Sequence, residues 1–254
     1  MRSLIKFLLS AALITCCGYS FAKSNLVAKT DSFETVNRHL SSFHNLHIQG
    51  PFDVYVTQGT DESIKFDAPV EVKDRIIADV SGNTLEIRNK HDNWGSSSEK
   101  SWYGDKSWWH HHPKIKVYVT FKNLDYIKVS GSGSVVFNDG LTTDELKLQL
   151  RGSGEISGKI AVKNLESHVS GSGHIKLSGT ALSSNVYVAG SGNFMASELI
   201  TSNSAVRVSG SGDAKINAND KITAAVSGSG NVNYTGSAKK LMSSTSGSGS
   251  ISRF

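Results

Sequence analysis

The second half of the chain alternates apolar and polar residues in short runs that meet at glycine-containing turns. Pairs of apolar residues stand two and four positions before a turn: Ile127 and Val129, Leu148 and Leu150, Val186 and Val188, Val206 and Val208, Ala224 and Val226. Single apolar residues stand two positions after a turn: Val135, Ile156, Ile175, Phe194, Ala214, Val232 and Ile251. A period of two in β-branched runs predicts strands with one buried face.

The residue three positions before each turn lies between these inward positions, varies in chemical type and is expected to face water: Lys128, Gln149, His168, Tyr187, Arg207 and Ala225. Gly, Ser, Asn, Val and Ile dominate this half, and they are poor helix formers. No segment has a sustained stripe with the 3.6-residue period of a helix. The pattern therefore predicts an all-β protein.

One triplet, Gly-Ser-Gly, recurs seven times at the turns. Its first glycines are Gly131, Gly152, Gly171, Gly190, Gly210, Gly228 and Gly247. The steps between them are 21, 19, 19, 20, 18 and 19 residues, and fourteen of the 24 glycines lie in these triplets. A nearly constant step of this length is typical of stacked repeats.

Two architectures fit strands joined by such turns. In an antiparallel meander each triplet would close a hairpin; in a parallel β-solenoid each circuit of about 19 residues would stack on the previous one. We favour the solenoid, because a meander has little reason to repeat the same triplet at every turn. Stacked glycines would allow positive φ and close approach of neighbouring backbones, and the serine hydroxyls would hydrogen-bond along the column.

The chain divides into four parts on this interpretation: 1–22 a signal peptide, 23–42 a lead-in, 43–128 an N-terminal β part, and 129–254 the repeat solenoid. The N-terminal β part contains the strand-like runs LHIQGPFDVYVTQG, SIKFDA, TLEIRNK and KIKVYVTF without the triplet. We expect them to begin the same solenoid. In the last coil, Ser243 and Thr245 replace the usual apolar pair, which predicts a more solvated terminal coil.

The first residues have the pattern of a secretory leader. Arg2 and Lys6 precede an apolar run over residues 7–17, and Ser20-Phe21-Ala22 follows as a small-x-small cleavage pattern. Cleavage after Ala22 would deliver the protein to the periplasm or the exterior. The alternative is a lipid anchor on Cys16, since residues 13–16 are similar to a lipobox; Thr15 is a poor residue at that position.

Removal of the leader changes the composition in two ways. Both cysteines, Cys16 and Cys17, would be lost, so the mature chain could form neither a disulfide nor a cysteine-ligated metal site. The charge would be 25 basic against 22 acidic side chains, or +3, which is too balanced to indicate a nucleic-acid partner. No other window has the roughly 20 apolar residues of a membrane helix.

The order of these elements resembles the family called putative auto-transporter adhesin, head GIN domain. The matching segments are FHNLHIQGPFDVYVTQGTDESIKFDA, VSGNTLEIRNK, KIKVYVTFKNLDYIKVSGSGSV and the recurring turns, which together cover roughly residues 43–254. The resemblance implies a right-handed parallel β-helix and a secreted or envelope location. It implies no catalytic residues, and nothing in this chain resembles a translocator barrel.

A segment of unusual composition, residues 89–113, interrupts the strand pattern. It holds all four tryptophans and a tyrosine, none of which the repeat needs for its core: Trp94, Trp102, Tyr103, Trp108 and Trp109. These rings are the ligand-binding candidates, because tryptophan faces stack on sugars and anchor protein hot spots. The alternative is a long loop that folds its aromatic residues over the solenoid as a cap.

Three consecutive histidines end this segment. Alternate residues of an extended chain share a side, so His110 and His112 are the only two of them that could share a metal ion, with Asp105 or His91 as a further ligand. A histidine tract in a loop binds metals only loosely, and we expect neither a physiological metal nor a cofactor.

A second column of equivalent positions follows the turns: Ser134, Glu155, His174, Asn193, Asp213, Asn231 and Ser250. One interpretation is a stripe that contacts glycans or cations. We favour a hydrogen-bonding ladder, since these residues are common in turns.

The sequence favours a non-enzymatic interaction module, adhesin-like, that binds a glycan, an envelope component or a protein. It lacks H-E-x-x-H, G-x-S-x-G and phosphate-loop motifs. The paired acids Asp61-Glu62 and Asp144-Glu145 lie in apparent turns and are expected to be solvated. The alternative is a polysaccharide lyase or hydrolase on a β-helix, although a fold does not confer an activity.

Overall fold

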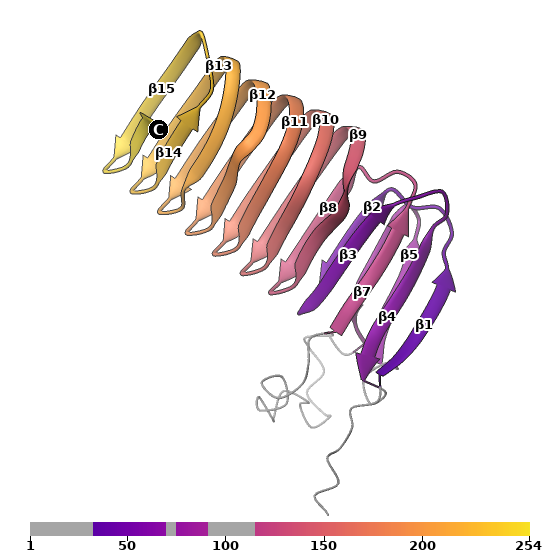
Figure 1. Ribbon diagram of the computed structural model, residues 1–254. Coiled ribbons are helices and arrows are strands. Elements are labelled where there is room, and N and C mark those ends of the chain that lie inside the picture. Colours follow the sequence, from indigo (N-terminus) through magenta and orange to yellow (C-terminus); the bar gives the residue numbers. More distant parts are fainter. Residues whose placement is uncertain (1–32, 70–74, 91–114) are drawn as a thin grey trace, which may run out of the picture. The chain divides into compact units, whose positions relative to one another are not determined.

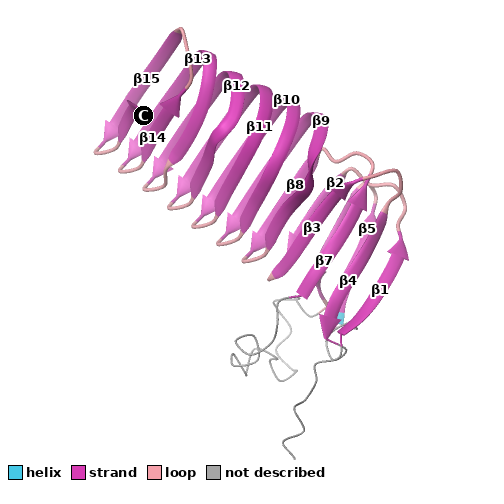
Figure 2. Ribbon diagram, viewed as in Figure 1, coloured by secondary structure: helices cyan, strands magenta, loops and turns pink. Residues whose placement is uncertain are grey.

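The computed structural model describes residues 33–69, 75–90 and 115–254, and nearly all of them are in strands (Figure 2). The strands are β1 (Phe33–His39), β2 (Asn45–Gln49), β3 (Phe52–Gln58), β4 (Ser63–Pro69), β5 (Ile76–Ser81), β6 (Thr84–Asn89), β7 (Ile115–Phe121), β8 (Tyr126–Gly131), β9 (Ser134–Gly152), β10 (Glu155–Gly171), β11 (His174–Gly190), β12 (Asn193–Gly210), β13 (Ala214–Gly228), β14 (Asn231–Thr235), β15 (Lys240–Gly247) and β16 (Ser250–Arg253). Within these residues no helix is long and apolar enough to span a membrane.

The repeat builds a parallel β-solenoid, as the sequence predicts. Strands β9 to β13 each run from one Gly-Ser-Gly turn to the next and pair in parallel with the strands of the neighbouring coils. Equivalent residues are partners: Gly171 of β10 pairs with Gly152 of β9 and with Gly190 of β11. Figure 1 shows the turns in a row along one edge. The antiparallel meander is therefore wrong.

Each coil has two faces. The first half of β9, residues 134–137, pairs with β3, whereas its second half, residues 147–152, pairs with β8. We call the sheet of first halves, with β3, β7, β4, β14 and β16, face A. The sheet of second halves, with β8, β2, β6, β5 and β15, is face B.

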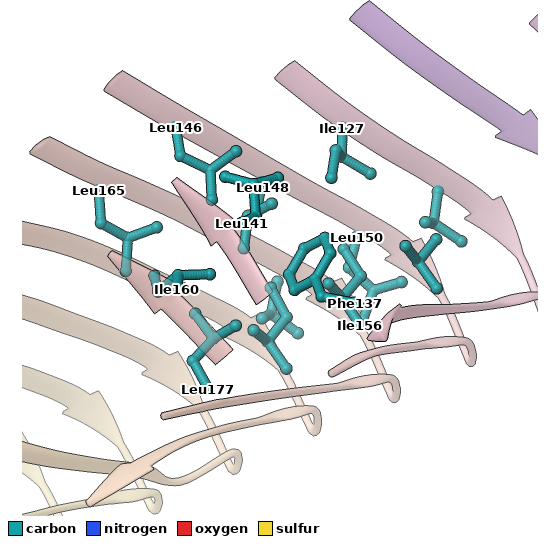
Figure 3. Packing of buried hydrophobic residues seen from close by; sticks show 14 of the residues in the cluster. Ile127, Phe137, Leu141, Leu146, Leu148, Leu150, Ile156, Ile160, Leu165 and Leu177 are labelled. Atoms are coloured by element: carbon teal, nitrogen blue, oxygen red, sulfur yellow. The ribbon is translucent and has the colours of Figure 1, made fainter. Parts of the chain in front are cut away.

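The core lies between the faces and consists of the apolar positions that alternate along each strand (Figure 3). Leu148, Leu150 and Ile156 are completely buried there. Burying a side chain of this size stabilises the fold by about 1.5–3 kcal/mol relative to leaving it exposed. Two serines also point inward, and the hydroxyls of Ser184 and Ser204 satisfy each other at 2.8 Å.

The turn column is made by backbone atoms. The first glycine of each triplet has a positive φ, between 107° and 123°. In the middle coils its carbonyl oxygen accepts two amides of the next coil: Ser172 N and Gly173 N both donate to Gly152 O at 2.9 Å. A Cβ added at the second glycine would collide with the coil below; at Gly212 it would lie 2.0 Å from Gly192 O. Both glycines are thus required by the close stacking of backbones.

The serines of the triplets do not hydrogen-bond along the column, and that expectation is wrong. All seven are exposed, and in the described part of the chain their hydroxyls have no partner within the protein. The amides and carbonyls of the corner satisfy one another instead, so the side chain between the glycines is left to solvent.

The N-terminal strands join the same solenoid but not in the order of the sequence. β2 pairs in parallel with both β6 and β8, and β3 with both β7 and β9, so the coil formed by β2 and β3 lies between strands that follow it in the chain. Gly50, with a φ of 121°, begins the turn column: a Cβ on Gly133 would lie 2.6 Å from its carbonyl oxygen. The expectation that these runs begin the solenoid is confirmed for β2, β3, β6 and β7.

The two ends of the described stack differ. At the N-terminal end three strands are antiparallel to their neighbours: β4 to β7, β1 to β4 and β5 to β6. Of these three, only β4 is one of the runs expected to begin the solenoid, and for this run the expectation of a parallel coil is wrong. At the other end all eight residues of β15 are exposed, including Ser243 and Thr245, which confirms a solvated last coil.

Candidate functional site

The residues predicted to bind a ligand or a metal lie outside the described residues. This holds for Trp94, Trp102, Tyr103, Trp108 and Trp109 and for the histidines at positions 110 and 112. Their roles therefore stay predictions. In residues 33–69, 75–90 and 115–254 there is no group of three or more His, Cys, Asp or Glu that could hold a metal ion.

The column of polar residues after the turns is a hydrogen-bonding ladder in its C-terminal part, which confirms the favoured interpretation. Asn193 Oδ1 accepts from Asp213 N at 2.9 Å, and Asp213 Oδ1 accepts from Asn231 N at 2.8 Å. Asn231 Oδ1 accepts from Ser250 Oγ at 2.8 Å. These oxygens satisfy amides of the next coil and are not free for a ligand.

The paired acids show one error of the sequence interpretation. Asp61, Asp144 and Glu145 are exposed, as expected, but Glu62 is only 8% exposed. Its carboxylate accepts a hydrogen bond from Ser42 Oγ at 3.0 Å, and Lys122 Nζ lies 3.9 Å away. Since it is engaged in holding the loop before β2, Glu62 is a structural acid.

A row of polar and aromatic side chains crosses the outer surface of face B. Lys128, Gln149, His168, Tyr187 and Arg207 occupy equivalent positions in five successive coils, each paired in register with the next. We call these residues the face B row. Each follows an inward-pointing residue by one position, so the pleat of the strand directs it outward.

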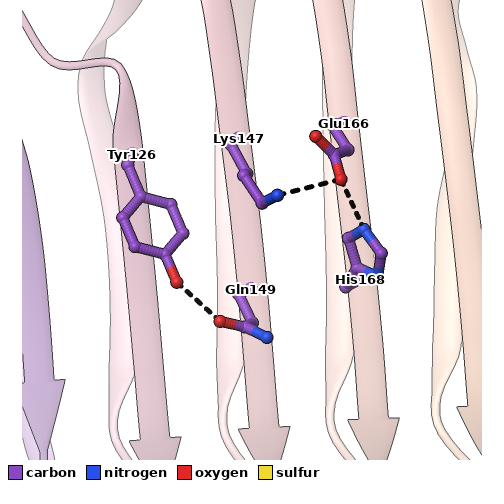
Figure 4. A network of polar contacts seen from close by, with 5 residues as sticks. All are labelled: Tyr126, Lys147, Gln149, Glu166 and His168. Carbon is purple, nitrogen blue, oxygen red and sulfur yellow. Dashed lines mark hydrogen bonds and ion pairs between the residues drawn. The ribbon is translucent and has the colours of Figure 1, made fainter.

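Neighbouring side chains tie the row together (Figure 4). Glu166 Oε1 accepts from Lys147 Nζ at 3.0 Å and lies 2.7 Å from Nε2 of His168. Tyr126 Oη lies 2.5 Å from the Gln149 amide. Figure 4 draws the amide oxygen toward Tyr126; the opposite orientation keeps this bond, with nitrogen donating, and lets the oxygen accept from Arg151 Nη2 at 2.9 Å.

Two rings form a platform within the row. The imidazole of His168 and the phenol of Tyr187 stack with centroids 4.7 Å apart and planes 12° from parallel. Tyr187 is 43% exposed, so part of its ring is free to contact another molecule. Because His168 is bonded to Glu166 on one side and stacked on the other, the platform is held in one orientation.

The electrostatics of this surface have identifiable causes. The hydrogen bonds from His168 and then Lys147 lower the pKa of Glu166, so this carboxylate stays charged. Burial raises the pKa of Tyr126. Burial and then the charge of Lys128 lower the pKa of His47, whose register partner is Lys128, so this imidazole stays neutral at neutral pH.

The cations of the surface outnumber its anions. Glu166 is shared by Lys147 and His168. In the described residues, Lys128 and Arg207 form no ion pair or hydrogen bond, and Arg151 has only the neutral amide of Gln149. Two or three positive charges are therefore available to an incoming anion.

A groove of about 410 Å³ begins at Arg207, because the side chains at the following equivalent positions are smaller. The next two positions of the row are Ala225 and Ser244. Ser209, Ser227 and Ser246 line one side, and all three are exposed. The arrangement offers a charged group, an aromatic face and several hydroxyls on one surface, which suits binding of a polar molecule.

The sequence predicts that the face B row faces solvent, but its pattern indicates no role for these residues. The signal was present, because the coils written beneath one another put His168 beside Tyr187 and Tyr187 beside Arg207. The unpaired state of the cations and the groove depend on the side chains of neighbouring strands, and the sequence does not indicate them.

Comparison with known proteins agrees with this fold. A putative adhesin from Bacteroides fragilis has 26% identity and a TM-score of 0.76, covering 89% of this chain and 98% of its own. A putative lipid binding protein from Parabacteroides distasonis has 21% identity and a TM-score of 0.66, covering 89% and 98%. A putative adhesin from Parabacteroides merdae has 20% identity and a TM-score of 0.66, covering 89% and 97%. The last two show the fold alone.

No curated protein matches the chain in sequence. The family model described as putative auto-transporter adhesin, head GIN domain, matches residues 42–238. This is most of the chain and includes β2 to β14. The chain therefore belongs to the putative auto-transporter adhesin, head GIN domain family.

Proposed function

We propose that the protein acts outside the cytoplasm as a non-enzymatic, adhesin-like module that binds a glycan or another component of an envelope or cell surface through face B. The observation that carries this proposal is the face B row. Five coils present a polar, partly aromatic surface with unpaired cations, and a groove continues from it. Such a surface suits recognition of an extended partner by many weak contacts.

Two further observations support the proposal. The leader over residues 1–22 has the pattern of a secretory signal, and several structural neighbours are named putative adhesins. The tryptophan segment is a second candidate surface for the same partner. Lipid anchoring at Cys16 is the alternative to a free mature chain that begins at Lys23, and the mass of the mature N-terminus distinguishes them.

Binding is tested with the protein expressed from its full-length sequence and purified. Glycans, vesicles and the envelope fraction of the source cells are the probes, and surface plasmon resonance is the readout. We expect saturable binding to at least one of them, weakened by the double variant Tyr187→Ala, Arg207→Gln. The matched control is Lys176→Gln, which removes an exposed charge on face A.

Three outcomes would overturn parts of this proposal. Absence of binding to every probe would remove the recognition role. Binding that the face B variant leaves unchanged but deletion of residues 94–112 abolishes would move the site to the tryptophan segment. Release of sugar from a polysaccharide probe, lost on replacing a single acid, would establish the enzyme alternative.

A further inference from the structure

The face B row has the length and direction of a track for a polymer. Strands of one sheet are about 4.8 Å apart, so the four steps from Lys128 to Arg207 span about 19 Å. The row crosses the strands, with one side chain contributed by each coil. A molecule bound along it would touch successive coils at a regular interval.

The charges on this track select an anionic ligand. Lys128 and Arg207 stand at its two ends, and within the described part of the chain neither side chain forms an ion pair or hydrogen bond. Beyond Lys128 the register continues through His47 to Glu86, whose carboxylate lies 3.9 Å from Arg88 Nε. The one carboxylate beside the middle of the track, Glu166, is already engaged by Lys147 and His168. A guanidinium binds a carboxylate or phosphate through two parallel hydrogen bonds, so Arg207 is the strongest anion ligand of the row.

The other groups favour a sugar polymer over a lipid or a peptide. His168 covers one face of the Tyr187 ring, but Tyr187 is still 43% exposed and lies next to Arg207, so the uncovered part of the ring is available to a sugar. The groove beyond it is lined by Ala225 and by serine hydroxyls, and it has no large apolar side chain on which acyl chains could pack. The strands β8 to β12 are paired on both sides along the row, which leaves no free edge for a peptide to add as a strand.

We propose that the face B row and the adjoining groove bind an acidic polysaccharide that carries carboxylated sugars. In this arrangement Arg207 and Lys128 bind carboxylates about four coils apart, the Tyr187 and His168 rings contact a sugar face between them, and the serine hydroxyls of the groove bind sugar hydroxyls. The inference rests on the proposed function and names the class of its ligand.

The test compares three polymers at low and moderate salt: polygalacturonate as the acidic glycan, dextran as the neutral glycan, and single-stranded DNA as a non-glycan polyanion. We expect the protein to bind polygalacturonate and neither of the others. The affinity should fall by about tenfold for Arg207→Gln, which removes a charge-assisted bidentate contact. Raising the salt concentration should weaken binding, because the charges are exposed.

Variants at Tyr187 distinguish the contribution of its ring to binding from the contribution of charge. Tyr187→Ala should weaken polygalacturonate binding, whereas Tyr187→Phe keeps the ring and should bind nearly as the parent protein does. Lys176→Gln on face A is the charge-matched control and should leave the affinity unchanged. Thermal unfolding of each variant confirms that the fold is intact, as expected for exposed positions.

The outcomes are distinct from those of the proposed function. Equal binding of dextran and polygalacturonate would overturn the acidic specificity and leave the proposed function standing. Stronger binding of DNA, or equal losses for Arg207→Gln and Lys176→Gln, would overturn the inference. If the envelope fraction binds through face B and polygalacturonate does not, this ligand class is wrong while the proposed function holds.

Discussion

The two corners of each coil differ in how regularly the strands of neighbouring coils pair. At the Gly-Ser-Gly corner the glycines of successive coils pair without a shift, from Gly131 to Gly247. At the opposite corner the ladder is irregular, with register shifts between Gly158 and Ile160 and between Met195 and Ile200. The first corner sets the register of the stack, and the second accommodates steps that vary from 18 to 21 residues.

The largest expected effect is at the Gly-Ser-Gly corner. Gly212→Ala would place a Cβ 2.0 Å from Gly192 O and 2.9 Å from Val188 Cγ1, so the coils must move apart. We expect a loss of about 3 kcal/mol in the free energy of unfolding, measured by urea denaturation. The opposite corner is less uniform: a Cβ on Gly179 would lie 2.0 Å from Ile160 O, but a Cβ on Gly140 meets Lys159 O only at 3.4 Å. Gly140 has a φ of 89°, so Gly140→Ala should cost about 1 kcal/mol.

The neighbouring serine gives the control for this pair. Ser211 is exposed and its hydroxyl has no partner in the described structure, so Ser211→Ala should change the free energy of unfolding by less than about 0.5 kcal/mol. Equal losses in the free energy of unfolding for Gly212→Ala and Gly140→Ala would contradict the conclusion that the Gly-Ser-Gly corner sets the register and the opposite corner tolerates change.

An insertion at the opposite corner tests the same difference between the corners, and its expected effect on the free energy of unfolding is smaller. Two residues, Gly-Ser, added between Ser197 and Glu198 lengthen the opposite corner, where pairing is already interrupted. Because the cost of a longer loop grows slowly with length, the loss should stay below about 1 kcal/mol. The same pair added after Ser211 should destabilise at least as much as Gly212→Ala. Thermal melting of the two insertion variants measures the difference.

The smallest expected effect lies between the corners, on face B. The pKa of Glu166 is lowered in the folded chain by the hydrogen bonds from His168 and Lys147. A carboxyl with a lowered pKa stabilises the fold above its ordinary value of 4.5, and this stabilisation is lost as the pH falls through the lower, folded value. The free energies of unfolding of the parent protein and of Glu166→Gln, measured in urea, should therefore differ by about 0.5 kcal/mol at pH 7 and converge as the pH falls below 4.5.

A difference between the two proteins that persists unchanged at acid pH, well below 4.5, would show that the substitution acts through packing and not through charge. The size is small because both side chains are well exposed, 46% for Lys147 and 41% for Glu166.

The sequence predicts the repeat half well because each element of the prediction is local. A period of two gives the buried positions, and the nearly constant step between glycines gives the partners of the residues that flank the Gly-Ser-Gly turns. The residues of the face B row follow from the same step. Their contacts do not, because the stacking of His168 on Tyr187 and the sharing of Glu166 depend on side-chain torsions that no repeat determines.

The sequence predicts the N-terminal half less well, for a physical reason. Gly50-Pro51 occupies the turn column without the triplet, and Asp53 pairs with Ser134, far along the chain. No local pattern connects these residues. The antiparallel direction of β1, β4 and β5 is equally hidden, since parallel and antiparallel strands share the same alternation.

The insertion of the β2–β3 coil between later strands has a consequence for how the molecule is assembled. During synthesis from the N-terminus, β2 and β3 are made before all of the strands with which they pair. Those strands, β6 to β9, lie within residues 84–152, so long loops must close before the β2–β3 coil is paired on both sides. Each later coil instead finds a finished template about 19 residues behind it. The slow step of folding should thus be the N-terminal block, after which winding proceeds quickly and in one direction.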